Sequence, residues 1–393
     1  MRKGYGKIAA GLLALLLVAA LAAGCAKPQE KVIKLGGIFD LTGATADVGV
    51  PYQEGVKDYF EYLNGKGGIN GKQVKLIGQD YAYKIDQAKA IYDQLVQNEK
   101  VVAVMGWGTG DTEVMVPKIT ADKIPYMSAS YSENLLEIAT HPYNFLIAPS
   151  YSDQARAVIK WIKDNWKDAS RNPRLALIYN DTGFGKSPIA DAKKYAAEIG
   201  VEVVDEEIVD LRALDATSQL LNMQKKEADF AIIQETSMAT ATILKDAARL
   251  GIKTQFIGLN WAADEKPIAL AEGKAEGYIG VIPFAFPYED VPGLKEIKEY
   301  LASKGKKLED KSQKYIQGWV SAKVMAEGIR LAGDNLTGEG VKKGLESIKN
   351  FDLGGAAAPV TFSADSHRGT TKMKLYQVKN GKFQPITDYI SYR

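Results

Sequence analysis

Residues 180–187 have the residue types of a phosphate-binding loop. They read NDTGFGKS between an expected strand and an expected helix, close to the P-loop pattern of nucleotide hydrolases. Asn180 stands where the first glycine belongs, and no strand ending in a metal-binding aspartate is evident to complete the site. Asp181 and Gly183 are also typical of an ordinary turn. We therefore do not expect nucleotide hydrolysis.

A second glycine-rich loop, GWGTGD at 106–111, follows an apolar run of strand length. A dinucleotide site requires glycine where Asp111 stands, so this pattern is incomplete. Alternate glycines still let a backbone approach another group closely. Exposed N–H groups in such a turn can hold an anion, and a purely structural tight turn is the alternative.

The other reactive residue types form no catalytic set. His141 and His367 are the only histidines, and both are expected at the surface. No serine–histidine–acid arrangement, zinc-ligand spacing or calcium loop is present, and Glu206 and Glu207 are neighbours that face opposite sides of an expected strand. We expect no enzyme activity, no catalytic residue, no metal ligand and no cofactor.

The N-terminus has the parts of a secretory signal. Arg2, Lys3 and Lys7 precede an apolar run at 8–23, which ends in small residues and Cys25. A membrane-spanning helix needs roughly 20 apolar residues, and this run is shorter. A permanent anchor helix is the alternative interpretation.

Cys25 determines how this terminus is interpreted. Small residues at 22–24 followed by cysteine resemble the bacterial lipobox, although Ala22 stands where leucine is commonest. The resemblance implies a signal peptide at 1–24, cleavage after Gly24, a lipid on Cys25 and a tether at 25–31. The protein would then be exported and lipid-anchored to a bacterial membrane, facing the periplasm or the cell exterior. Cys25 is the only cysteine, so the mature part has no disulfide and no thiol nucleophile.

Charge excludes a nucleic-acid partner. Three of the 50 basic residues precede Cys25, which leaves 47 against 48 acidic residues and a net charge of about −1. No basic stripe stands out along the chain, and a stripe of that kind is the footprint of nucleic-acid binding.

Strand-length apolar runs alternate with helical patterns along the chain. Runs at 32–39, 74–78 and 101–106 are separated by helical patterns, one of which places Val56, Tyr59, Phe60 and Leu63 on a single face. The same order restarts at 174–179. Strands alternating with helices predict parallel βαβ units, and the repeat predicts two α/β lobes with a cleft at the carboxyl ends of their strands.

The lobe boundaries follow from this order. We expect residues 32–149 plus 279–355 in an N-terminal lobe and 150–278 plus 356–393 in a C-terminal lobe. The strand expected at 278–284 would return to the first lobe together with the helix at 315–331. A chain that crosses between lobes several times would form a hinge.

Five segments resemble the periplasmic-binding-protein family of the branched-chain amino acid type, whose members are partners of ABC transporters. They read GGIFDLTGATADVGVPYQEGVKDYFEYLNGKGGINGKQVKLIGQD at 36–80, AVMGWGTGDT, IPYMSASYSENL, LALIYNDTGFGKS and AARLGIKTQFIG. The resemblance runs from about residue 32 to the end. It implies the α/β type I fold, with two Rossmann-like lobes joined by a three-segment hinge and a cleft that closes on a ligand.

The resemblance also implies ligand contacts. Backbone N–H groups and hydroxyls of the loop after the third strand would hold the ligand carboxylate, and the next loop would supply a carbonyl and a hydroxyl. An aromatic residue and a threonine would reach the ligand from the second lobe. The matching positions are Trp107, Gly108, Thr109, Gly110, Ser130, Ser132, Phe184 and Thr236.

One position departs from the family pattern. Amino-acid binders usually place an acid in the loop after FIG to pair with the ligand ammonium, and here Asn260 stands in its place. A buried ammonium without a carboxylate is costly. Asp111 or Glu235, both on cleft loops, would substitute for it. Alternatively the ligand has no ammonium, and Trp107, Phe184 and Trp261 suit an aromatic or other apolar carboxylate, although each ring is also compatible with ordinary packing.

We therefore expect a monomeric, extracytoplasmic solute-binding lipoprotein of an ABC importer. Its partners would be a branched-chain or related amino acid, a permease, and the membrane through its lipid. An aromatic or other apolar carboxylate without an ammonium is the alternative ligand. A ligand sensor that acts with a signalling partner is the alternative role, and an enzyme is the third, disfavoured class.

Overall fold

The computed structural model describes residues 32–393, of which Ile33–Arg393 form one compact unit. Cys25, the expected signal peptide and the expected tether lie outside the described residues. Within residues 32–393, no helix combines the length and the apolar composition that crossing a bilayer requires.

The first sheet is fully parallel and is built from the first third of the described chain. Its order is β2-β1-β3-β4-β5. The strands are β1 Ile33–Phe39, β2 Val74–Asp80, β3 Val104–Gly106, β4 Tyr126–Ser128 and β5 Asn144–Phe145. The short strands β3, β4 and β5 are buried at every residue, as is typical of parallel strands covered by helices on both faces.

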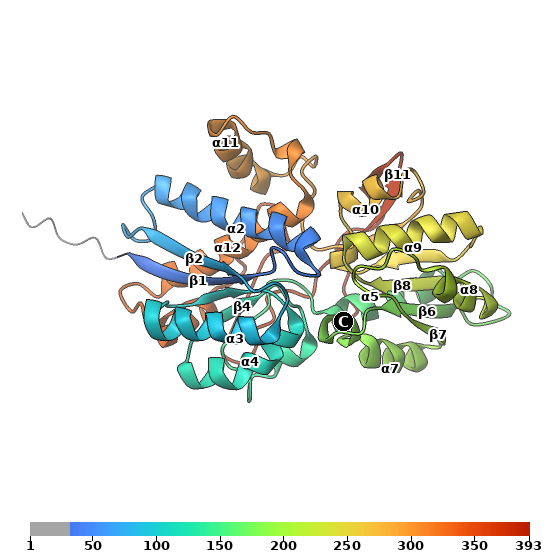
Figure 1. Ribbon diagram of the computed structural model, residues 1–393, viewed down its shortest axis with the longest axis horizontal. Coiled ribbons are helices and arrows are strands. Elements are labelled where there is room, and N and C mark those ends of the chain that lie inside the picture. Colours follow the sequence, from blue (N-terminus) through green and yellow to red (C-terminus); the bar gives the residue numbers. More distant parts are fainter. Residues whose placement is uncertain (1–31) are drawn as a thin grey trace, which may run out of the picture. The chain divides into compact units, whose positions relative to one another are not determined.

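Helices from two distant parts of the chain cover this sheet (Figure 1). They are α2 Ala46–Gly65, α3 Ile85–Asp93, α4 Thr109–Asp122, α12 Gln313–Leu331 and α13 Gly338–Glu346. Two glycines let α2 and α12 lie in close contact. A Cβ on Gly55 would lie 2.0 Å from the carbonyl oxygen of Tyr315, and one on Gly318 would lie 2.0 Å from that of Tyr52.

The second sheet has the order β12-β11-β10-β9-β8-β6-β7, parallel from β10 to β7 with two antiparallel strands at the other edge. Its strands are β6 Arg174–Tyr179, β7 Glu202–Ile208, β8 Phe230–Gln234, β9 Gln255–Gly258, β10 Ile279–Ile282, β11 Lys374–Lys379 and β12 Lys382–Pro385. The helices of this lobe include α5 Tyr151–Asn165, α6 Gly183–Lys186, α7 Ile189–Ile199, α8 Thr217–Lys225, α9 Ser237–Leu250 and α10 Glu265–Leu270. Helix α11, Lys295–Ser303, lies between β10 and α12 in the chain.

Two expectations about location are wrong. The strand expected to return to the first sheet is β10, which pairs with β9 and β11 in the second sheet, so 279–282 do not belong with the N-terminal lobe. All four of its residues are buried, and such a pattern suits either sheet. His367 is not at the surface. It is 1% exposed, and its side chain hydrogen-bonds to Asn144 and Glu346. The centroids of the His367 and Phe145 rings lie 3.8 Å apart.

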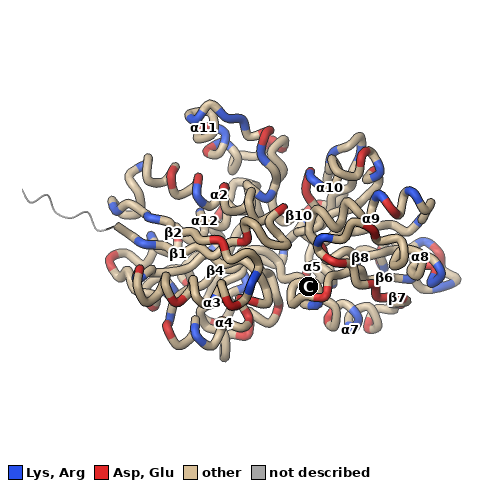
Figure 2. The backbone as a smooth tube through the Cα atoms, viewed as in Figure 1, with Lys and Arg blue, Asp and Glu red and all other residues tan. Residues whose placement is uncertain are grey.

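Charges of both signs are interspersed over both lobes, as Figure 2 shows. This agrees with the near-zero net charge of the sequence and with the absence of a basic stripe along it.

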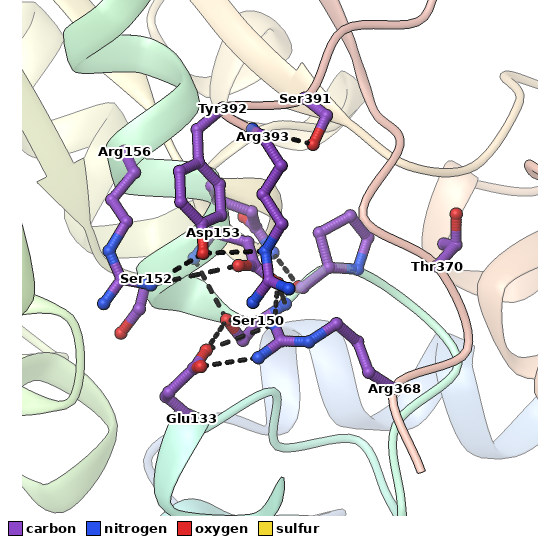
Figure 3. A network of polar contacts seen from close by, with 12 residues as sticks. Glu133, Ser150, Ser152, Asp153, Arg156, Arg368, Thr370, Ser391, Tyr392 and Arg393 are labelled. Atoms are coloured by element: carbon purple, nitrogen blue, oxygen red, sulfur yellow. Dashed lines mark hydrogen bonds and ion pairs between the residues drawn. The ribbon is translucent and has the colours of Figure 1, made fainter. Parts of the chain in front are cut away.

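Sheet membership makes the chain pass between the lobes three times: after β5, between β10 and α12, and before β11. An ion-pair network joins the first and third of these crossings (Figure 3). The Arg368 guanidinium donates to Glu133 Oε1 at 2.5 Å and also to Asp153 Oδ2. Ser150 caps α5 in a capping box with Asp153. One arginine thus ties the third crossing to the start of α5.

We expect Arg368→Met to destabilise the protein by about 3 kcal/mol, because the fully buried Asp153 carboxylate loses its main cationic partner. Urea unfolding measures the change. The same exchange at Lys160, whose pair with Asp164 is exposed, is the matched control and is expected to cost about 0.5 kcal/mol or less. Equal losses in the two variants would contradict the expectation.

Candidate functional site

A cavity lies where the loops at the carboxyl ends of the parallel strands of the two sheets meet. It holds about 270 Å³ of space free of protein atoms, open solvent at its mouth included. The residues that line it follow β1 to β4 in the first lobe and β6, β8 and β9 in the second, together with the start of α5. They are Thr45, Val48, Tyr83, Trp107, Gly108, Thr109, Ala129, Tyr151, Phe184, Thr236 and Trp261.

The structure brings some of the sequence-predicted residues to this cavity and places others behind it. Trp107, Thr109, Phe184 and Thr236 line it, and so do Gly108 and Trp261. The remaining predicted residues are not among the lining residues. They are Gly110, Asp111, Ser130, Ser132, Glu235 and Asn260. Which of these contact a ligand stays a prediction.

Helix α4 begins at the cavity wall. Gly108 is its N-cap residue and Thr109 its first residue, and both line the cavity. Helix α9 of the other lobe has Thr236 as its N-cap residue, which also lines the cavity. The first N–H groups of a helix lack intrahelical partners and carry partial positive charge, so they favour an anionic group. No lysine or arginine is among the described residues that line the cavity.

The two serines predicted after β4 orient other side chains. Ser130 Oγ shares a 2.6 Å hydrogen bond with Thr109 Oγ1. Ser132 Oγ donates to Glu113 Oε1 at 2.7 Å and accepts from Ser187 Oγ of the second lobe at 3.1 Å. Ser130 therefore sets the rotamer of a cavity-lining hydroxyl, and Ser132 joins the two lobes.

Aromatic rings form the apolar walls. The Trp107 and Trp261 rings lie 5.1 Å apart at 62°. Their indole N–H groups are satisfied within the protein, because Trp107 Nε1 donates to Thr45 Oγ1 at 2.8 Å and Trp261 Nε1 donates to the Tyr151 hydroxyl at 3.0 Å. The ring centroids of Tyr151 and Phe184 lie 5.4 Å apart, with the rings edge to face. The walls thus offer ring surface rather than free donors, which suits an apolar body.

Sequence reasoning missed five lining residues: Thr45, Val48, Tyr83, Ala129 and Tyr151. Thr45 follows β1, and buried Asp40 holds it by accepting from its backbone N–H and its hydroxyl at 2.8 and 2.7 Å. Position 151 carries no signal of its own, because only the start of α5 brings it to the cavity.

Tyr83 reaches the cavity through an unusual turn. Ala82 and Tyr83 have φ of 50° and 56°, the left-handed region that non-glycine residues rarely adopt. Asp80 stabilises this turn by accepting from the N–H groups of Leu41 and Ala82 at 2.9 Å each. Burial raises the pKa of Asp80, but these bonds and the Thr42 hydroxyl outweigh it and lower the pKa. No residue type in this segment predicts such a turn.

Two buried acids lie behind the lining. Asp111 is 3% exposed; the Tyr81 hydroxyl donates to its Oδ1 at 2.9 Å, and Oδ2 has no partner among the described residues. Burial raises the pKa of Asp111 to about 6. Glu235 is fully buried; Asn180 donates to its Oε2 at 3.1 Å, while Oε1 has no partner there. Burial raises its pKa as well. Each acid retains one free oxygen.

The comparisons with known proteins decide the family. The family described as periplasmic binding protein matches residues 32–382. The chain belongs to this family. Its members are solute-binding proteins, so the expectations of a type I α/β fold, of a binding protein and of no enzyme activity are confirmed.

Proteins similar to this periplasmic binding protein carry names that refer to different ligands. It is 23% identical over 386 residues to Leu/Ile/Val-binding protein homolog 7 of Brucella suis biovar 1 (strain 1330), covering 94% of this chain and 95% of the relative. A branched-chain amino acid ABC transporter protein from Thermus thermophilus with bound valine is 27% identical, with a TM-score of 0.86 over 92% and 97% of the two chains. A fatty acid ABC transporter substrate-binding protein from Thermomonospora curvata is 23% identical, with a TM-score of 0.81 over 92% and 93%, which shows the shared fold alone.

The Asn260 position of this periplasmic binding protein has a cation beside it. Asn260 is 1% exposed, both polar atoms of its side chain lack partners among the described residues, and its carbonyl accepts from Lys314 Nζ at 2.5 Å. Lys314 is fully buried, also donates to the Ala263 carbonyl at 3.2 Å, and lies 5.3 Å from the centre of the Trp261 ring. Lys314 thus holds the cavity wall from behind, and the sequence offers no sign of it.

Burial lowers the pKa of Lys314 to about 8 from 10.5. Between about pH 8 and 10.5 Lys314 is neutral in the folded protein but still protonated in the unfolded chain. The free energy of unfolding should therefore rise as the pH increases from about 8 to 10.5. Relative to Lys314→Met, wild type should gain at most about 3 kcal/mol across this window. Urea unfolding at several pH values checks this. Lys295→Met, at an 81% exposed side chain, is the control that should follow wild type. A constant difference between wild type and Lys314→Met across the window would contradict it.

Proposed function

We propose that this protein is the extracytoplasmic solute receptor of an ABC importer and that it captures a small carboxylate with an apolar body in the interlobe cavity. A branched-chain or related amino acid is the first candidate. One observation carries the proposal: α4 begins at a cavity that α9 of the opposite lobe also borders and whose walls include several aromatic rings. Relatives named for leucine, isoleucine and valine support it.

The anionic end of the ligand would lie at the start of α4. Gly108 and Thr109 border the cavity there, and backbone N–H groups recognise a carboxylate without a neutralising cation. Trp107, Trp261 and Phe184 would enclose the apolar body. The hydroxyls of Thr109 and Thr236 would supply polar contacts from the two lobes.

The ammonium of an amino acid is the open point of this proposal. Asp111 and Glu235 each have a free carboxylate oxygen, yet neither lines the cavity. Lys314 lies behind Trp261 and bonds to the carbonyl of Asn260, which stands where the family usually places an acid, and a like charge repels an ammonium. These observations favour a second candidate, an apolar carboxylate without an ammonium group.

Ligand capture would proceed by hinge closure. Several contacts join the two lobes around the cavity, among them Ser187 to Ser132 and the Arg212 guanidinium to the Thr42 carbonyl at 3.2 Å. A ligand that touches both lobes binds the closed arrangement better than an open one and therefore shifts the population toward it. A lipid on Cys25 would hold this monomeric receptor near its permease and raise its effective concentration there.

Three compounds with the same branched body test the proposal: leucine, 4-methylpentanoate and 3-methylbutylamine. We expect at least one of the two carboxylates to raise the melting temperature, and the amine to leave it unchanged, because only a carboxylate matches the N-terminus of α4. A ligand at 100 times its Kd stabilises the folded state by about 2.7 kcal/mol. Scanning calorimetry of the purified protein gives the melting temperature and the stabilisation free energy. Stabilisation by the amine alone, or by none of a broad panel of amino acids and small carboxylates, would refute the proposal.

The two acids are tested separately. If Asp111 or Glu235 carries the ammonium, Asp111→Asn or Glu235→Gln should weaken leucine binding at least tenfold and leave 4-methylpentanoate binding unchanged, because only leucine has the group that needs the charge. Asp181→Asn, at a 64% exposed side chain on the loop after β6, is the matched control. Unchanged leucine affinity in both variants would show that neither acid has this role.

A further inference from the structure

Helices α2 and α9, labelled in Figure 1, belong to different lobes and touch at their first turns. Asp47 lies in the first turn of α2, and its Oδ2 accepts a hydrogen bond from the Met238 N–H at 2.9 Å. Met238 is the second residue of α9, a helix of 14 residues. The side chain of Lys266 also reaches the Asp47 carbonyl, at 3.4 Å. Asp47 is therefore bound to the opposite lobe through both its carboxylate and its backbone.

The Asp47 carboxylate accepts the hydrogen bond that an N-cap side chain usually accepts at the start of a helix. Thr236 is the N-cap residue of α9, and its side chain makes no capping bond. The first N–H groups of a helix need acceptors, and a negative charge beside them is stabilised by the helix dipole. Here an aspartate of the other lobe supplies both the acceptor and the charge. This capping contact can exist only while the lobes are together.

The contact borders the cavity directly. Thr45 and Val48, on either side of Asp47 in the chain, line the cavity from the first lobe. Thr236, immediately before α9, lines it from the second lobe; its hydroxyl is buried, makes no well-formed hydrogen bond within the described residues, and lies beside the Asp47 carboxylate. Because Met238 and Thr236 belong to one rigid helix start, holding Met238 N–H also fixes where the Thr236 hydroxyl lies.

We propose that Asp47 is a positioning residue of the ligand site: by capping α9 from the opposite lobe it holds Thr236 against the ligand and slows ligand release. This role rests on the proposed function of the cavity and adds a residue that does not line it. Asp47 acts through α9, so its loss weakens the closed arrangement whichever carboxylate is bound.

If Asp47 has this role, its loss should weaken the binding of every ligand equally, and the weakening should come from faster dissociation. Removing an N-cap acceptor typically changes an equilibrium constant by roughly tenfold. Asp47→Ala should speed the release of each bound carboxylate, leucine or 4-methylpentanoate, by about tenfold and leave their affinity ratio unchanged. Asp47→Asn keeps an acceptor oxygen and should recover part of the loss. On this proposal the protein without ligand is mainly open and lacks the contact, so its melting temperature should not change.

Stopped-flow dissociation and calorimetry on wild type, both variants and Asp86→Ala test this role. Asp86 is also a first-turn aspartate of a first-lobe helix, but it is exposed, so its variant should behave as wild type. Unchanged release in Asp47→Ala would overturn the proposal. A loss confined to leucine would also overturn it, because Asp47 would then touch the ammonium directly. A lower melting temperature with unchanged affinity would show a purely structural role. If wild type itself binds neither these compounds nor a broader panel, the proposed function fails and the positioning role falls with it.

Discussion

A parallel βα unit places the start of each helix beside the carboxyl end of the strand before it, and the cavity of this protein depends on that constraint. The loops after β1, β2, β3 and β4 in one lobe and after β6, β8 and β9 in the other all open toward the same space. At the start of α4 the first N–H groups lack intrahelical partners and carry partial positive charge, whereas the Met238 N–H at the start of α9 is already bonded to Asp47. Under the proposed function, the α4 backbone would hold the anionic group without a lysine or arginine among the described lining residues.

The residues around the cavity are held by bonds within the protein. Asp40 fixes the Thr45 loop, Ser130 fixes the Thr109 hydroxyl, and Tyr151 holds the Trp261 indole. Groups whose geometry is set before the ligand arrives lose little freedom on binding. One carboxylate oxygen each of Asp111 and Glu235 has no partner among the described residues, a property that they share with buried polar atoms elsewhere in the protein.

The charge near Trp261 separates this protein from the usual amino-acid receptor of its family. An amide, Asn260, takes the place of the acid, and the ammonium of Lys314 bonds to the carbonyl of that same residue. Similar folds occur in a protein with bound valine and in one named for fatty acids. The fold thus leaves the ligand class undetermined.

Local patterns in the sequence determined much of this protein. The alternation of apolar strands and amphipathic helices predicted two parallel α/β lobes with a cleft at the carboxyl ends of their strands, because the loops of a parallel sheet gather there. Trp107, Thr109, Phe184 and Thr236 were chosen through the family resemblance and do line the cavity.

Only the tertiary structure decided the rest, because those features depend on contacts between distant residues. The pairing of β10 with β9 and β11 placed that strand in the second sheet, although its apolar residues suit either one. The left-handed turn at Ala82 and Tyr83 depends on hydrogen bonds to Asp80, which the residue types do not predict. The sequence alone predicts Lys314 and Asp47 to be ordinary surface charges. In the structure, contact with the second lobe buries Lys314 and lets Asp47 cap α9.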